Sequence, residues 1–228
     1  MFYYDYYYLV LVVPAIIISL IAQMKVQSTF KKYAQVMSFR GMTATEVVQK
    51  ILEWNGIYNV RIERVAGELT DHYDPRTNVI RLSDTVYGNP SVASIGVAAH
   101  EAGHAVQYAK GYVPIKIRNS ILPVANIGSK LSLPLIIFGL ILSMQPLVEF
   151  GILLFSFVLI FQLVTLPVEF NASRRAISTL NNSGILQGEE LHGAKKVLGA
   201  AAMTYVAAAL TTAMQLLRLI LISRRRND

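Results

Sequence analysis

The sequence predicts a mostly α-helical membrane protein with three to four transmembrane helices and a small α+β domain. Hydrophobic residues make up 54% of the 228 residues and only 15% are charged, whereas soluble domains carry about 25% charged residues. The apolar residues form long blocks, and most charged residues lie together between the first two blocks. This composition excludes a disordered chain. The absence of cysteine excludes thiol catalysis and cysteine-ligated metal.

Four apolar blocks account for the predicted membrane helices, because each approaches or exceeds the length of about 17–25 residues that spans a bilayer. They are residues 8–24, 121–144, 146–166 and 197–223. Only a short link separates the uncharged cores of the second and third blocks, which predicts a helical hairpin. The fourth block contains Arg218, so it either spans the membrane or lies in its interface.

We expect five segments along the chain. They are an N-terminal transmembrane anchor (1–24), a polar segment with a helix, a β-hairpin and a second helix (25–118), a transmembrane hairpin (119–168), a helix (169–196), and a fourth apolar helix with a basic tail (197–228). The polar segment holds 12 Lys+Arg and 8 Asp+Glu, which places it in the cytoplasm by the positive-inside rule. The hairpin returns residues 169–196 to that side. A spanning fourth helix would put the terminal arginines outside, so either that helix lies in the interface or the topology is inverted.

Local patterns predict the elements of the polar segment. A helix capped by Thr43 or Thr45 runs to Asn55-Gly56, where the glycine stops it. Alternating apolar and charged residues predict a strand at 60–65, and a second strand follows at 79–82. Asn89 then caps another helix, with Pro90 at its first position; this helix ends near Lys110.

That last helix carries the strongest functional pattern in the chain, His100-Glu101-Ala102-Gly103-His104. Histidines four residues apart project from the same face of a helix, as two ligands of one zinc ion must. Glu101 follows the first histidine, where its carboxylate can take a proton from a zinc-activated water. We therefore predict Zn²⁺ bound by His100 and His104, with Glu101 as general base.

A zinc ion of this kind needs a third protein ligand and an open coordination position. The candidates are His72, Glu149, Glu169, Glu189, Glu190 and His192. Topology removes Glu149, which lies at the far end of the hairpin. Glu169 is the best candidate because it follows Pro167, where the third apolar block emerges on the side of the histidine helix. The alternative is an interfacial carboxylate that pairs with Arg174 or Arg175.

The histidine motif, followed by Glu169-Phe170-Asn171-Ala172 on a second helix, resembles the gluzincin metallopeptidases. More narrowly, most of the chain resembles the YugP-like family of small membrane-bound bacterial zinc metallopeptidases, relatives in pattern of the HtpX and CAAX-prenyl-protease groups. The resemblance implies a zincin-like catalytic domain, zinc ligands His100, His104 and Glu169, and Glu101 as general base. In the wider gluzincin pattern an aspartate that orients a ligand histidine occupies the position of Ser173. Ser173 can accept a hydrogen bond but brings no charge.

Two further roles stay open in the sequence. A strand beside the metal with one unpaired edge can bind an extended peptide by β-augmentation, and residues 77–82 fit that role as well as they fit a structural hairpin. A tetrahedral intermediate also needs an electrophilic donor. Tyr108, Tyr112, Arg174 and Arg175 are equal candidates.

We therefore expect an integral membrane zinc endopeptidase that hydrolyses peptide bonds of membrane-associated or nearby substrates. Its partners would be the lipid bilayer and a protein or peptide substrate, and its site would face the cytoplasm from a bacterial plasma membrane. One alternative is a site-2-type intramembrane protease, but the chain lacks an Asp-Gly motif. The other is a zinc-binding membrane scaffold without proteolytic activity, which would normally close its site with a fourth ligand. Scattered basic residues argue against nucleic-acid binding, and no oligomeric state is predicted.

Overall fold

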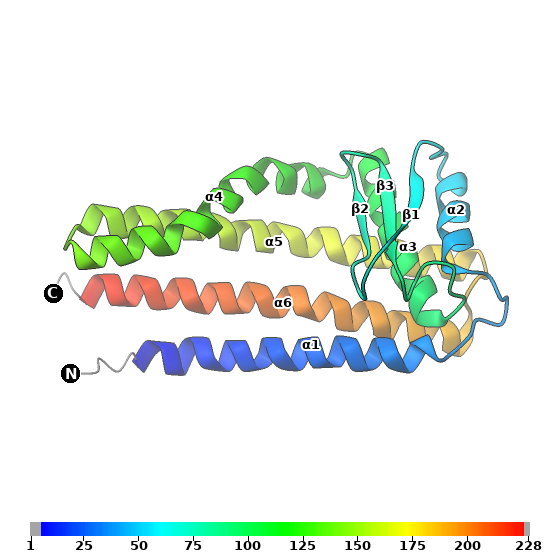
Figure 1. The fold of residues 1–228 in the computed structure, drawn as a ribbon, viewed down its shortest axis with the longest axis horizontal. Helices are drawn as coiled ribbons and strands as arrows, with labels where there is room; N and C mark the ends of the chain where they lie inside the picture. Colours follow the sequence, from blue (N-terminus) through cyan, green and yellow to red (C-terminus); the bar gives the residue numbers. More distant parts are fainter. Residues whose placement is uncertain (1–5, 226–228) are drawn as a thin grey trace. The chain divides into compact units, whose positions relative to one another are not determined.

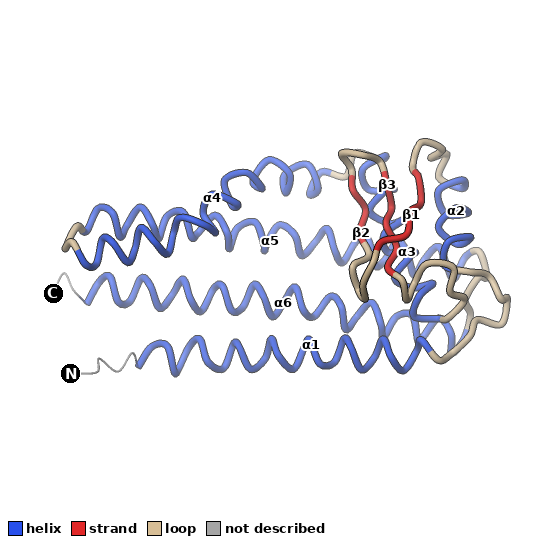
Figure 2. The backbone as a smooth tube through the Cα atoms, in the orientation of Figure 1, coloured by secondary structure: helices blue, strands red, loops and turns tan. Residues whose placement is uncertain are grey.

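The structure, a computed structural model, describes residues 6–225 and is shown in Figures 1 and 2. The first five residues of the predicted anchor and the end of the basic tail lie outside this range. The helices are η1 (Tyr8–Val12, a π-helical turn), α1 (Val13–Ala34), α2 (Ala44–Trp54), α3 (Val92–Ala109), α4 (Val113–Ile141), α5 (Gln145–Asn182) and α6 (Gly188–Arg225). The strands are β1 (Arg61–Val65), β2 (His72–Asp74) and β3 (Val79–Ser83).

Four helices are long and apolar enough to cross a membrane: Tyr8–Ala34, Val113–Ile141, Gln145–Asn182 and Gly188–Arg224. They contain the four apolar blocks apart from residues 142–144, which follow the end of α4, and this confirms a mostly α membrane protein with a small α+β part. The helices also continue into polar sequence. α5 passes through Pro167, although proline lacks the N–H that a helix interior uses, a loss that membrane helices tolerate. Glu169 therefore lies within α5 instead of on a separate helix.

The chain forms two compact units, each described here by itself. The first, the helical unit, comprises Met1–Gln23, Lys116–Pro167 and Met203–Asp228. The second, the mixed unit, comprises Met24–Ile115 and Val168–Ala202. The mixed unit contains the sheet, α2, α3 and every residue of the predicted zinc site.

The sheet of the mixed unit has the strand order β1-β3-β2. β1 and β3 are parallel, with Ile62 opposite Ile80, and β2 is antiparallel to β3, with Tyr73 opposite Ile80. The expected hairpin therefore joins β2 to β3, and the two strands predicted from the sequence do not form it. Strand β2 was missed because its three residues are too few for an alternating pattern.

The two helices of the polar segment differ in how well their caps were predicted. For α2, Thr43 is the N-cap: its hydroxyl accepts the amide of Glu46, whose carboxylate accepts the amide of Thr43. For α3, the prediction of Asn89 was wrong, because Ser91 is the cap and accepts the amide of Ser94. Asn89 instead accepts the amide of Ser91, a turn before the helix that asparagine also favours.

The core of the mixed unit fixes α3 against its neighbours. Small residues cover the buried faces of α3, which lets other elements approach closely. The fully inaccessible side chains include Val47 and Val48 of α2, Ile80 and Leu82 of β3, Ala98, Ala99 and Ala102 of α3, and Ala172 and Leu180 of α5. The face of α3 that carries the histidines is therefore held in place by burial on its other sides.

Candidate metal centre

Helices α3 and α5 bring the three predicted ligands together. His100 Nε2 lies 3.1 Å from His104 Nε2 and 3.2 Å from Glu169 Oε2. His104 Nε2 lies 3.5 Å from the same carboxylate oxygen. The histidines are one turn apart on α3, and Glu169 reaches them from α5. Three potential ligand atoms thus form a triangle with edges of 3.1–3.5 Å.

The dimensions of this triangle fit zinc. Ligand distances of about 2.0–2.2 Å in a tetrahedral site place neighbouring ligand atoms about 3.3–3.6 Å apart. The observed edges are within a few tenths of an ångström of that range. Among residues 6–225 the group of potential metal ligands consists of these three side chains. A tetrahedron built on them has a fourth corner without a protein ligand from this part of the chain, which is the arrangement of catalytic zinc sites.

The surroundings of the triangle favour a cation. Glu169 is only 5% exposed, and both histidines are half-buried. Burial disfavours the charged form of His104, but its hydrogen bond with Glu169 and the charges of Glu101 and Glu169 together raise its pKa. The carboxylates of Glu101 and Glu169 thus stabilise positive charge at a buried site. The same negative charges would favour a divalent cation there.

Glu101 is a buried carboxylate without a fixed partner. Its side chain lies on α3 beside His100, and the residue is 8% exposed. Within residues 6–225 its carboxylate forms no hydrogen bond or ion pair. A buried charged group of a purely structural kind is normally paired. Glu101 therefore has free acceptor atoms, which a general base needs.

Each histidine of the candidate site is contacted by a polar side chain at its second ring nitrogen. His100 Nδ1 lies 3.0 Å from Ser173 Oγ, and His104 Nδ1 lies 3.0 Å from Gln107 Oε1. Ser173 occupies the position where the wider family pattern has an aspartate, and it contacts His100 as that position suggested. Gln107 was missed, and its only trace in the sequence is a polar residue three positions after His104.

The close approach of α3 and α5 depends on Gly103. A Cβ atom at this position would lie 2.8 Å from the carbonyl oxygen of Ala172 on α5. Real Cβ atoms essentially never come that close to another heavy atom, and the obstacle is rigid helix backbone. The missing side chain between the two histidines therefore sets the distance at which Glu169 meets them.

We expect Gly103→Ala to destabilise the protein by about 1–3 kcal/mol, the usual cost of overpacking. Thermal or denaturant unfolding in detergent measures the change. Gly199→Ala is the matched control, because a Cβ atom there meets nothing within 4 Å. Alanine in an open helical position should be neutral or stabilising by up to about 1 kcal/mol. Equal stability of the two variants would refute the steric role of Gly103.

The other ligand candidates lie elsewhere. His72 is exposed on β2 and its Nδ1 contacts the carbonyl of Thr70. Glu190 Oε1 accepts the amide of Phe39 at 2.6 Å. Glu189 and His192 are exposed at the start of α6. None of these side chains belongs to the metal-ligand group found among residues 6–225.

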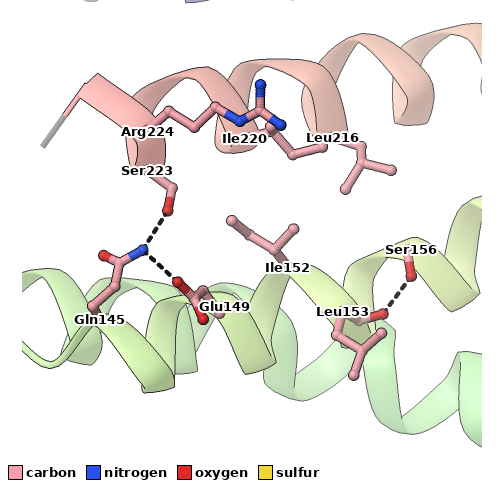
Figure 3. Close-up of a pocket in the computed structure, with 9 residues that line it drawn as sticks. All are labelled: Gln145, Glu149, Ile152, Leu153, Ser156, Leu216, Ile220, Ser223 and Arg224. Atoms are coloured by element: carbon pink, nitrogen blue, oxygen red, sulfur yellow. Dashed lines mark hydrogen bonds between the residues drawn. The ribbon is translucent and has the colours of Figure 1, made fainter. Parts of the chain in front are cut away.

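Glu149, which topology excluded as a ligand, belongs to the helical unit. It lines a cavity of about 410 Å³ between α5 and α6, whose lining residues are drawn in Figure 3. Gln145 Nε2 donates to Glu149 Oε1 and to Ser223 Oγ at one end of this cavity, and apolar side chains such as Ile152 line it. This cavity contains none of the zinc-site residues.

The candidate electrophiles have other partners in the mixed unit. Tyr108 packs edge-on against Tyr73 of β2, with ring centroids 5.5 Å apart. The guanidinium of Arg175 lies over the ring of Tyr112. Arg174 and Arg175 line a cavity of about 300 Å³ between α2, α3 and α5, together with Lys110. The contacts of these four residues do not single out one of them as the electrophile.

The strand proposed for peptide binding is the central strand of the sheet. β3 pairs with β1 along its whole length and with β2 over Val79–Arg81. It therefore lacks the free edge that β-augmentation requires. Residues 77–82 instead form part of a structural hairpin.

Comparison with known proteins extends the resemblance beyond the site. A family model described as "Putative neutral zinc metallopeptidase" matches residues 8–224. The chain is 45% identical over 221 residues to "Putative membrane protease YugP" of Bacillus subtilis (strain 168), a match that covers 97% of this chain and 98% of the relative. No solved structure matched. The ligand triangle, the helices able to cross a membrane and this full-length match agree: the chain is a membrane protein that belongs to this zinc metallopeptidase family, with zinc as its cofactor.

Proposed function

We propose that the protein is an integral membrane zinc endopeptidase in which His100, His104 and Glu169 hold the metal and Glu101 is the general base. The observation that carries this proposal is the triangle of ligand atoms with edges of 3.1–3.5 Å. Its open fourth corner favours catalysis over the closed four-ligand arrangement of a structural zinc site. The scaffold alternative is therefore less well supported.

The chain's own residues divide the chemistry between them. When bound, zinc would supply a Lewis acid that polarises a carbonyl group and lowers the pKa of a water molecule. Glu101 takes the proton of the attacking water on its carboxylate and then delivers it to the leaving amide nitrogen. Within residues 6–225 no hydrogen bond or ion pair occupies its oxygens, so this carboxylate is available for both transfers.

The position of Glu169 on α5 supports substrates that lie near the bilayer. Glu169 is three residues beyond Leu166, where the apolar block of α5 ends. A site with a ligand on a membrane-crossing helix stays at the membrane surface. We therefore propose protein or peptide substrates within or beside the membrane, and a site facing the cytoplasm of a bacterial cell.

Removal of the metal tests the proposal. The detergent-solubilised protein, dialysed against a strong chelator, should lose cleavage of a fluorogenic peptide library and regain it with one equivalent of Zn²⁺. The reason is that the proposed reaction has no other electrophile of comparable strength. Metal analysis on the same samples should follow activity. Full cleavage by metal-free protein would contradict the proposal.

A further inference from the structure

Gln107 is a fully buried polar residue whose side chain is completely hydrogen-bonded. It lies on α3 one turn beyond His104 and is 0% exposed. Its Oε1 lies 3.0 Å from His104 Nδ1. Its Nε2 donates to the carbonyl oxygen of Val168 at 2.8 Å and to Asn171 Oδ1 at 3.0 Å, both on α5. One amide thus joins a metal ligand to the helix that carries Glu169.

The partners of Gln107 fix which way its amide faces. A backbone carbonyl can only accept a hydrogen bond, so the atom of Gln107 that meets Val168 must be the NH₂ group. Asn171 Oδ1 also accepts the Nε–H of Arg175 at 2.7 Å. Because a guanidinium has donors only, the atom of Asn171 in this contact must be its oxygen. The oxygen of Gln107 is then the atom that meets His104.

This orientation determines the tautomer of His104. The Oε1 of Gln107 can only accept, so His104 must carry its proton on Nδ1. His104 Nε2 is then left with a lone pair directed at the ligand triangle, as a neutral imidazole ligand requires. Ser173, the partner of His100, is a hydroxyl that can donate or accept. The contact with Gln107 therefore permits one tautomer of His104, whereas the contact with Ser173 permits either tautomer of His100.

We propose that Gln107 is a positioning residue that sets the tautomer and ring orientation of His104, and that Asn171 and Arg175 hold Gln107 in the orientation required. The guanidinium of Arg175 is itself placed against the ring of Tyr112. The chain Arg175–Asn171–Gln107–His104 thus runs from an aromatic contact to a metal ligand. This inference rests on the proposed function of the same site.

Zinc affinity is the property that tests this role. Gln107→Met keeps the length of the side chain and removes all its hydrogen bonds, so we expect the zinc dissociation constant to rise about 10–100-fold. Competition with a chromophoric chelator at fixed pH measures it. The Co²⁺-substituted protein should show a shifted visible absorption band, because the geometry of the His104 ligand changes. A residue that merely packed α3 against α5 would leave the Co²⁺ band unchanged.

Asn171 provides a second test, because its side-chain oxygen accepts hydrogen bonds from Gln107 and Arg175 and not from a histidine among residues 6–225. Asn171→Asp keeps an oxygen for Gln107 and Arg175, and should retain zinc affinity within a few-fold. Asn171→Leu removes that oxygen and should weaken zinc binding about tenfold. Asn182→Leu is the matched control on α5, since Asn182 is exposed and its side-chain amide donates to Ser178 Oγ, outside the candidate site. This arm tests the proposal even if Gln107→Met does not fold.

Two results would overturn the inference. One is unchanged zinc affinity in Gln107→Met, and the other is equal affinity in Asn171→Asp and Asn171→Leu. Measurement of Glu169→Ala alongside separates this failure from failure of the proposed function. If Glu169→Ala loses zinc while the Gln107 and Asn171 variants retain it, the ligand assignment stands and only the positioning role fails.

Discussion

A Glu101→Gln protein is expected to keep its zinc and to lose peptide cleavage by a factor of about 10²–10⁴, the usual contribution of a general base. The amide has nearly the same shape as the carboxylate but cannot accept a proton. Glu101 has no hydrogen-bond or ion-pair partner within residues 6–225, so the change removes no hydrogen bond or ion pair from the described fold. Cleavage of the fluorogenic library and metal content, measured on the same preparation, separate chemistry from binding.

The matched control for this experiment is Glu53→Gln. Glu53 lies on α2 and is exposed, and its carboxylate accepts the side-chain amide of Gln49. The same loss of charge there should leave cleavage unchanged. Normal cleavage by Glu101→Gln would remove Glu101 from the mechanism. Loss of zinc together with activity would instead assign Glu101 a part in holding the metal.

Glu169→Ala is expected to weaken zinc binding by about 10²-fold or more and to abolish cleavage with it. Residues that hydrogen-bond to metal ligands already change metal affinity about 10–100-fold when mutated. Loss of a ligand itself should weaken metal binding further. The substitution removes the only oxygen of the triangle and leaves two histidines, fewer than the three protein ligands of known catalytic sites. Chelator competition gives the dissociation constant, and elemental analysis after dialysis gives the metal content.

Glu149→Ala is the control for the loss of Glu169. It is the same substitution on the same helix, at a carboxylate that contacts Gln145 in the helical unit. This variant should bind zinc normally. Tight zinc binding by Glu169→Ala would contradict the ligand assignment. Another acidic residue of the mixed unit would then have to be the third ligand.

The sequence predicted those parts of the molecule that depend on local pattern. Apolar length identified the helices able to cross a membrane, and the spacing of His100 and His104 identified the face of α3 on which the candidate metal centre lies. The pairing of β1 with β3 was not predictable in the same way. Parallel strands are not joined by a tight turn, so no local turn pattern in the sequence indicates that they pair. The cap of α3 was missed because Asn89 and Ser91 are both good capping residues, and the contacts around them decide between the two.

The side chains that hydrogen-bond to His104 and to its partner were not predicted, for a related reason. Glu169 could be chosen because a zinc site needs a third ligand, so chemistry narrowed the search. Nothing comparable indicated Gln107 or Asn171, because the sequence does not distinguish a buried amide side chain from one on the surface. Only the packing of α3 against α5, set by Gly103 and Ala172, shows that the two amides meet.

The order of the ligands along the chain has a consequence for biosynthesis. A ribosome that has made α1 to α3 has already produced His100, Glu101 and His104, but not Glu169. Glu169 emerges only after α4 and the apolar part of α5 have been translated. The proposed peptidase centre can therefore be completed only after the membrane hairpin has been translated, so a nascent chain that has not yet made the apolar part of α5 lacks one of the three proposed ligands.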